Sequence, residues 1–244
     1  MPSLTLHGMN SPNVAKVVIM LEECGLSYHT RHVAVFNQAQ FTPEFLELNP
    51  LGKVLVLEDS LLGCPIAESG AILLWLAERQ EDFLPTTQPE RAEVLQWLMV
   101  QMANYGPMLG QLNHFRLALH SGGQPYAEGR YAATAERLYR ILDDRLQRLE
   151  WIAGNAYSIA DIAMHPWANY LEVHGFDPAK HPALVRWRET IASRPAVQRA
   201  YARLQVDFAK AVEESRKAAT PQDLDRFFGR TGQMPAADFS RTTR

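Results

Sequence analysis

The pattern of apolar and polar positions divides the first eighty residues into short alternating elements. Stretches in which apolar residues cluster, or alternate with polar ones, predict strands over 3–8, 27–35, 54–59 and 65–67, the last a short edge strand. Apolar residues at helical spacing predict helices over 12–24, 42–47 and 68–79. The order of these elements is β-α-β followed by β-β-α, which predicts a compact α/β unit.

Helical periodicity replaces this alternation from about residue 90 onward. It predicts helices over 91–119 (broken or bent at Gly106-Pro107 and Gly110), over 126–149, from 158, over 182–193 and over 196–214. A turn is expected over 121–125, where glycines and a proline cluster.

The predicted organisation is therefore two domains and a tail. It comprises a thioredoxin-like α/β domain over 1–80, a linker over 81–89, an all-α domain over 90–215 and a tail over 216–244. In the tail, Leu224, Phe227 and Phe228 indicate one short docked segment, and the remainder is expected to be mobile.

The first predicted helix begins with a Ser-Pro-Asn sequence that is suited to an anion. Ser11 is placed to cap the helix, and Pro12 to occupy its first turn. Backbone N–H groups at a helix N-terminus attract negative charge, and Ser11 and Asn13 add a hydroxyl and an amide donor. A thiolate, carboxylate or phosphate would fit this position. An ordinary helix start without a ligand explains the same residues and remains the alternative.

A second helix start, Glu68-Ser69-Gly70, has the same logic. Ser69 is placed to cap the helix, and Glu68 beside it is suited to a cationic amine. A ligand with an α-amino acid group would suit this pair. A thioredoxin-like arrangement places both helix starts on one edge of the domain. Two ordinary helix caps without a ligand remain the alternative.

Further along, Ser158 and Asp161 have capping-box spacing, so Asp161 is expected to be structural rather than a catalytic acid.

Charge and cysteine content narrow the classes of function. A net charge of -3 and a pI of about 6.2 argue against a nucleic-acid partner or an anionic membrane surface. The sequence has no apolar run near the roughly twenty residues of a membrane span, and its N-terminus lacks the pattern of a secretory signal. Cys24 and Cys64 do not form a C-x-x-C motif; they are expected to be buried and favour a reduced, cytoplasmic protein.

Other catalytic signatures are missing from the sequence. The histidines lack metal-ligand spacing, His114 and His120 included, so no metal is expected. The sequence contains no G-x-S-x-G, P-loop or G-x-G-x-x-G motif, which removes support for a hydrolase or a nucleotide-binding protein. An aromatic-rich stretch of the 91–119 helix is expected mainly to pack the interior, although some of its residues could wall a cleft; it comprises Trp97, Tyr105, His114 and Phe115.

These elements and motifs together resemble the cytosolic glutathione transferases, which combine a thioredoxin-like domain, a short linker and an all-helical domain. Residues 68–73 resemble the family's γ-glutamyl-binding motif, and 158–161 its N-capping box. Residues 11–13, 40–45 and 106–111 resemble segments of the Nu class, the bacterial glutathione-dependent disulfide-bond oxidoreductases. The similarity covers roughly residues 3–205, and the 106–111 segment is its most specific part.

The resemblance implies a cytoplasmic homodimer that binds glutathione and reduces disulfide bonds without a protein cysteine. It implies that Ser11 and Asn13 are catalytic and donate hydrogen bonds to the glutathione sulfur. The other implied contacts are Gln40 and Lys53 at the glycine end, the Val54 backbone at the cysteinyl part, Glu68 and Ser69 at the γ-glutamyl group, and Arg130 from the second long helix. The implied ligands are glutathione as co-substrate and a small disulfide or electrophile. The charge, the apolar runs and the histidine spacing described above predict no metal, no nucleic acid and no membrane.

One position departs from the family pattern. The family has a cis-proline directly after the position of Val54, whereas here that residue is Leu55. A cis bond before a residue other than proline costs about 2.5–4 kcal/mol, so we expect either a trans bond with a displaced Val54 or a cis bond that carries this cost.

Four functions of different classes are compatible with these features. A glutathione-dependent disulfide-bond reductase comes first, and conjugation of glutathione to electrophiles is an alternative that uses the same thiolate. A non-catalytic binding protein on this fold is a further alternative, supported by Leu55. A purely structural dimer module would explain the helix caps but not Gln40, Glu68 and Arg130 together.

Overall fold

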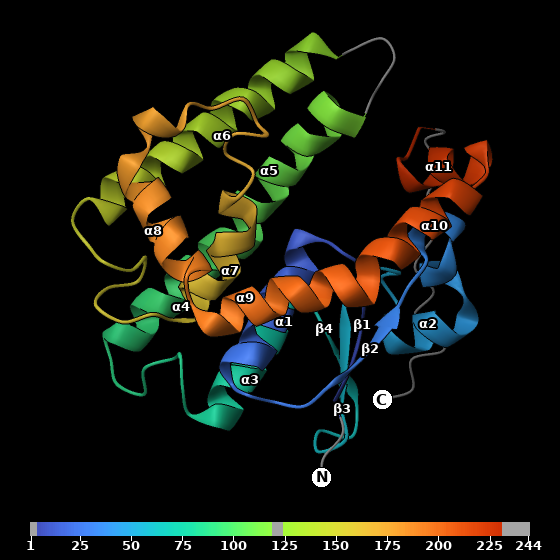
Figure 1. Ribbon diagram of the computed structural model, residues 1–244, viewed down its shortest axis with the longest axis horizontal. Coiled ribbons are helices and arrows are strands. Elements are labelled where there is room, and N and C mark those ends of the chain that lie inside the picture. The colour runs from blue at the N-terminus through green and yellow to red at the C-terminus, as the bar shows by residue number, and fades with distance from the viewer. Residues whose placement is uncertain (1–3, 119–123, 231–244) are drawn as a thin grey trace. The chain divides into compact units, whose positions relative to one another are not determined.

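The computed structural model describes residues 4–118 and 124–230, and Figure 1 shows their arrangement. The strands are β1 (Leu4–Gly8), β2 (His29–His32), β3 (Val56–Asp59) and β4 (Pro65–Ala67). The α-helices are α1 (Pro12–Glu23), α2 (Pro43–Leu48), α3 (Ser69–Gln80), α4 (Glu90–Val100), α5 (Gly106–Asn113), α6 (Pro125–Leu146), α7 (Ile159–Ala168), α8 (Pro182–Ala192), α9 (Pro195–Leu204), α10 (Lys210–Ala218) and α11 (Pro221–Phe227). Short 3₁₀ segments are η1 (Val35–Asn37), η2 (Ala39–Phe41) and η5 (Pro178–Lys180), and π-helical turns are η3 (Gln101–Tyr105), η4 (His114–Ala118) and η6 (Gln205–Ala209). The expectations for residue 3, His120, the 121–123 part of the turn and the 231–244 part of the tail lie outside the described residues.

The chain forms two compact units. Unit 1 comprises residues 1–72 together with 199–244, and unit 2 comprises residues 73–198. The described part of the second segment of unit 1 runs to residue 230 and contains α10 and α11. Unit 1 is therefore discontinuous in sequence, because its last helices follow the whole of unit 2.

Unit 1 is built on a four-stranded sheet with strand order β2-β1-β3-β4. β2 pairs with β1 in parallel, β3 pairs with β1 antiparallel, and β4 pairs with β3 antiparallel at the edge, as predicted for 65–67. β2 is shorter than the predicted 27–35 strand. After Val33, whose N–H donates to Gly8 O at 2.8 Å, the chain turns into η1 and buries Val35 and Phe36 in the core.

The two faces of this sheet have different apolar partners. Leu6 of β1 and Leu57 of β3 are in register, point to the same face and are fully buried. Val56 points to the opposite face, where Phe45 of α2 packs. Figure 1 shows α2 on the side of the sheet away from α1.

The core on the α2 face also includes helices from the end of the chain. Val33, Val35, Phe36, Phe45 and Val56 form its buried centre. Val212 of α10 and Leu224 and Phe227 of α11 pack against it. Leu224 and Phe227, two of the three residues from which a docked segment was predicted, thus pack against this core.

Unit 2 is helical, and its first long helix is interrupted as the glycines suggested, with one difference. The π-helical turn η3 ends directly before Gly106-Pro107, so the helical hydrogen-bond pattern changes at the predicted position while the backbone stays helical. Gly110, by contrast, lies inside the regular helix α5. A Cβ at Gly110 would lie 3.3 Å from Cη2 of Trp167, so this glycine serves close packing rather than bending. Among the described residues, no helix is long and apolar enough to cross a membrane.

Candidate functional site

The start of α1 has the geometry that its sequence predicts. Ser11 is the N-cap, with extended backbone (φ -151°, ψ 158°), and its Oγ accepts from the Val14 N–H at 3.4 Å. Pro12 occupies the first helical position, and Asn13 beside it is exposed. A hydroxyl that accepts a hydrogen bond still has its own proton to donate, so Ser11 and Asn13 both carry donors at the positive end of the helix.

A buried lysine connects this helix start to that of α3. Lys16, one turn into α1, is 1% exposed, and its Nζ donates to Ser69 Oγ at 3.3 Å. Ser69 is the first residue of α3 and is 6% exposed. The predicted pairing of the two polar helix starts on one part of unit 1 is thus made by a direct side-chain contact.

Burial changes the protonation of this lysine. Removal from water lowers the pKa of Lys16 from 10.5 to about 7, and the negative charge of Glu68 opposes this shift. The sequence alone assigned no role to Lys16. The available signal was that a lysine interrupts an otherwise apolar run, 14–21, whose residues are all buried in the structure.

Glu68 has a backbone conformation that is uncommon for its residue type. Its φ is +71°, in the left-handed region where residues other than glycine are uncommon. Its carbonyl nevertheless accepts from the Ile72 N–H at 3.0 Å, and its side chain is exposed at the start of α3. Such a conformation in a polar residue beside a helix start is frequent at ligand-binding positions.

Gln40 and Lys53 lie on two neighbouring loops of unit 1. Gln40 is in η2 and is 5% exposed, and its Oε1 has no hydrogen-bond partner among the described residues. Asn49 Nδ2 donates to the Lys53 carbonyl at 2.7 Å, while the Lys53 side chain is exposed. The two loops touch at Gly52, which precedes Lys53, and Phe41, which follows Gln40. Gly52 has a φ of +61°, and a Cβ there would lie 2.5 Å from Cε1 of Phe41.

Of the two forms expected for the peptide bond before Leu55, the structure has the cis form. The Val54–Leu55 peptide bond is cis. Val54 is half-buried and packs against the core on the α2 face, and Leu55 is 4% exposed.

Arg130 belongs to unit 2, apart from the other predicted site residues. It is exposed on α6 and lines an open hollow of about 620 Å³ together with Tyr126, Thr134 and Arg137. The predicted residues of unit 1 are thus found on the α1 start, the α3 start and the two loops, whereas Arg130 lies on a separate unit.

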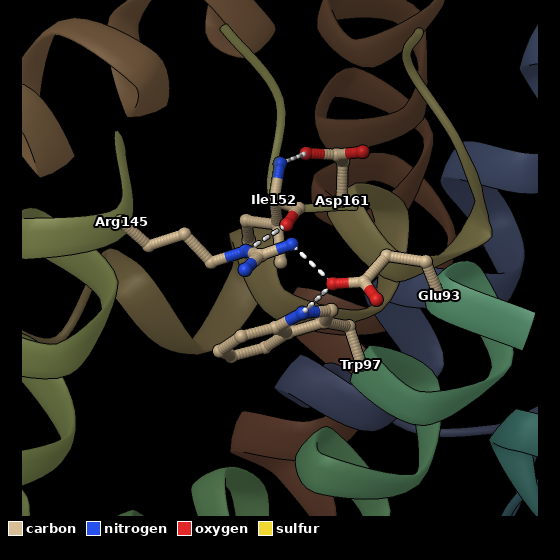
Figure 2. Close-up of polar contacts among 5 residues, drawn as sticks. All are labelled: Glu93, Trp97, Arg145, Ile152 and Asp161. Carbon is tan, nitrogen blue, oxygen red and sulfur yellow. Dashed lines mark hydrogen bonds and ion pairs between the residues drawn. The ribbon is translucent and has the colours of Figure 1, made fainter. Parts of the chain in front are cut away.

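A polar network in unit 2 accounts for Asp161 and Trp97 structurally. Asp161 is fully buried, completes the capping box with Ser158 and accepts from the Ile152 N–H at 2.9 Å. Figure 2 shows how this contact continues: Arg145 donates to the Ile152 carbonyl and pairs with Glu93, which accepts from the Trp97 indole. The interpretation of Asp161 as a structural residue is confirmed.

The aromatic-rich stretch divides into buried and half-buried members. Tyr105 is 1% exposed and packs edge-on against Tyr139. Phe115, near the end of the stretch, is half-buried and stacks on Tyr131 with ring centroids 5.5 Å apart. The predicted interior packing is therefore confirmed for Tyr105 and Trp97, the latter 7% exposed.

The expectation that both cysteines are buried is wrong. Cys24 and Cys64 are half-buried, and neither forms a disulfide. Cys24 ends α1 as its C-cap, and Cys64 lies in the turn before the edge strand β4. Among the residues that the structure describes, no group of three or more histidine, cysteine or acidic side chains is arranged to hold a metal ion.

Comparison with known proteins identifies the family. The glutathione S-transferase N-terminal domain matches residues 2–78, and the glutathione S-transferase C-terminal domain matches residues 115–195. The chain is 41% identical over 210 residues to the disulfide-bond oxidoreductase YfcG of Escherichia coli K12, an alignment that covers 83% of this chain and 96% of YfcG.

Solved structures agree with this assignment. A glutathione transferase family member from Pseudomonas fluorescens, with two glutathione molecules bound, is 35% identical with a TM-score of 0.73, covering 81% of this chain and 91% of its own. A glutathione transferase from Pseudomonas putida, with one glutathione disulfide per subunit, is 35% identical with a TM-score of 0.75, covering 81% and 90%. The predicted fold class, a thioredoxin-like domain with an all-α domain, is confirmed, and the chain belongs to the glutathione S-transferase family.

Proposed function

We propose that this chain is a glutathione-dependent disulfide-bond reductase. The observation that carries the proposal is the start of α1, where Ser11 caps the helix, Asn13 is exposed and Lys16 connects the helix to Ser69. A relative named as a disulfide-bond oxidoreductase, and a related structure with glutathione disulfide bound, support the same reaction.

Each predicted site residue has a proposed role toward glutathione. Ser11 and Asn13 donate to the sulfur and, with the N-terminal end of α1, favour its thiolate form. Glu68 and Ser69 hold the γ-glutamyl group, the carboxylate of Glu68 pairing with its ammonium. The other proposed contacts are the Val54 backbone with the cysteinyl part, Gln40 and Lys53 with the glycine carboxylate, and Arg130 with a carboxylate of the ligand.

The chemistry is thiol–disulfide exchange with glutathione as the source of both electrons. The thiolate attacks one sulfur of the substrate disulfide, forms a mixed disulfide and releases the other sulfur as a thiolate that takes up a proton. A second glutathione thiolate then attacks the mixed disulfide, giving glutathione disulfide and the second substrate thiol. The protein's part is to raise the thiolate fraction and to orient it, so neither Cys24 nor Cys64 takes part.

The first experiment tests the Ser11 hydroxyl. Reduction of 2-hydroxyethyl disulfide by glutathione is measured for the wild type, Ser11→Ala and Ser11→Thr. A hydrogen bond to a charged group contributes about 1.5–3 kcal/mol, so Ser11→Ala is expected to lower kcat/KM roughly 10- to 150-fold. Ser11→Thr keeps a hydroxyl and a capping oxygen and should retain most of the activity. Equal activity in Ser11→Ala and the wild type contradicts the proposal.

The second experiment separates thiolate binding from helix stability at Asn13. Asn13→Ala removes the amide donor, and Asn13→Asp also places a negative charge beside the thiolate. Because an acidic side chain in the first turn stabilises the helix, Asn13→Asp should be at least as stable as Asn13→Ala while having lower activity. Activity that follows stability in these two variants would assign Asn13 to the fold alone.

The assembly and location remain proposals as well. We propose a homodimer in the cytoplasm, to be checked by light scattering and by fractionation of cells that express the chain.

Conjugation of glutathione to a chloronitrobenzene uses the same thiolate and distinguishes a transferase from a reductase when both rates are measured on one preparation.

A further inference from the structure

Two helices near the end of the chain pack against the loop that carries Gln40. The loop consists of η1, Gln38 and η2, and the helices are α10 and α11, all within unit 1. These helices lie beyond residue 195, where the match to the family's C-terminal domain stops. Both helices pack against η1.

An aromatic contact anchors this packing. The rings of Phe36 in η1 and Phe227 in α11 lie with centroids 4.6 Å apart. The guanidinium of Arg216 in α10 lies 5.8 Å from the Phe36 ring centroid. Phe36 is 7% exposed, so its ring is enclosed by the sheet core and by these two helices together.

A hydrogen bond fixes the loop at the residue that precedes η2. Gln38 has a φ of +65° and ends η1 as well as preceding η2. Its Nε2 donates to the backbone carbonyl of Asp223 in α11 at 3.0 Å. α11 is itself held in shape by a capping box in which Thr220 and Asp223 bond reciprocally. The direction in which the chain leaves Gln38 toward Gln40 is thus tied to α11.

Gln40 lies two residues after Gln38, in η2. It is 5% exposed, and its Oε1 has no hydrogen-bond partner among the described residues. A buried amide in this state costs free energy unless a ligand completes it. A ligand can use the amide at full strength only if the loop already holds it in place, because ordering a loop on binding weakens affinity.

We infer that α10 and α11 are a positioning device for Gln40, and that they set the affinity for the glycine end of glutathione. This inference rests on the proposed function. The helices act through the Phe36–Phe227 contact and the Gln38–Asp223 hydrogen bond, and they touch the loop rather than the ligand. Their loss weakens binding of glutathione but leaves the thiolate chemistry at Ser11 in place.

The experiment compares glutathione with γ-glutamylcysteine, which has the same thiol and γ-glutamyl group but no glycine. KM for each thiol is measured in 2-hydroxyethyl disulfide reduction with full-length Phe227→Ala. We expect KM for glutathione to rise about tenfold, and KM for γ-glutamylcysteine and both kcat values to stay within about twofold, as for a lost preorganised contact of about 1.4 kcal/mol. Phe228→Ala is the matched control, since it removes the neighbouring aromatic ring, which packs edge-on against Phe227, and leaves both rings of the Phe36–Phe227 contact in place.

A second variant avoids any loss of core packing. Gln38→Glu has the same shape but replaces the donor to the Asp223 carbonyl by a carboxylate, which repels that carbonyl. It is expected to raise KM for glutathione about threefold, with no change for γ-glutamylcysteine.

Gln40→Ala links these results to the proposed function. It should raise KM for glutathione alone, and Phe227→Ala should add little to it in the double variant. If Gln40→Ala raises KM for glutathione but Phe227→Ala and Gln38→Glu do not, or if they raise KM for both thiols equally, the positioning role is overturned and the proposed function stands. If Gln40→Ala has no effect, the assignment of Gln40 fails and the inference fails with it.

Discussion

Replacement of Lys16 by methionine is the sharpest test of the buried contact between the two helix starts. Lys16 is 1% exposed and donates to Ser69 Oγ at 3.3 Å. Methionine fills a similar volume without a titratable group. The variant therefore removes the protonation equilibrium while it disturbs the packing of α1 little.

The magnitude follows from the pKa of Lys16, which burial lowers from 10.5 to about 7. Between these two values the unfolded state binds the proton and the folded state does not, so stability rises with pH across this window. The lysine alone should raise the free energy of unfolding by about 2 kcal/mol between roughly pH 7 and pH 9. Below about pH 6 both states are protonated and the contribution is constant.

The assay is urea unfolding of the wild type, Lys16→Met and Lys16→Arg across this pH range. Arginine stays charged throughout, so both variants should lack the rise that the wild type has, although they differ in charge. The difference in unfolding free energy between wild type and either variant should therefore change by about 2 kcal/mol from pH 7 to pH 9. A difference in unfolding free energy that stays the same from pH 7 to pH 9 would refute the claim that burial favours the neutral amine of Lys16.

Three further predictions concern other parts of the chain. Gly52→Ala should lower thermal stability by at least about 2 kcal/mol and raise KM for glutathione, because φ is +61° and the new Cβ would meet the Phe41 ring at 2.5 Å. Burial lowers the pKa of His165 to about 4, so acidification from about pH 7.5 to pH 5 should cost the wild type about 2 kcal/mol that His165→Phe does not lose, measured by urea unfolding. Asp161→Ala should cost at least about 3 kcal/mol in thermal unfolding, since the Ile152 N–H and other buried donors lose their acceptor; a loss near 1 kcal/mol would contradict this.

Local signals in the sequence predicted the helix starts of the candidate site. Ser11 and Pro12 specify an N-cap and first turn through their own backbone and side-chain chemistry, and Ser158 with Asp161 specifies a capping box in the same way. Interactions within four residues decide such features, so they can be recognised without knowledge of the fold.

Features that depend on distant partners could not be predicted in this way. The role of Lys16 depends on Ser69, which is 53 positions away, and Gln38 meets Asp223 across 185 positions. β2 ends early because Val35 and Phe36 join a core to which helices from the end of the chain also contribute. A periodicity pattern records that these residues are apolar but not which elements will cover them.

The discontinuity of unit 1 has a consequence for how the protein is made. Residue 199 leaves the ribosome long after residue 72, roughly 6–25 seconds later at about 5–20 residues per second. During that interval the nascent chain has the four strands and α1–α3 but not α10 and α11, so Phe36 and its neighbours lack part of their cover. The unit that begins the chain is thus completed last, and the apolar cluster around Phe36 gains its full cover only after the whole of unit 2 has been translated.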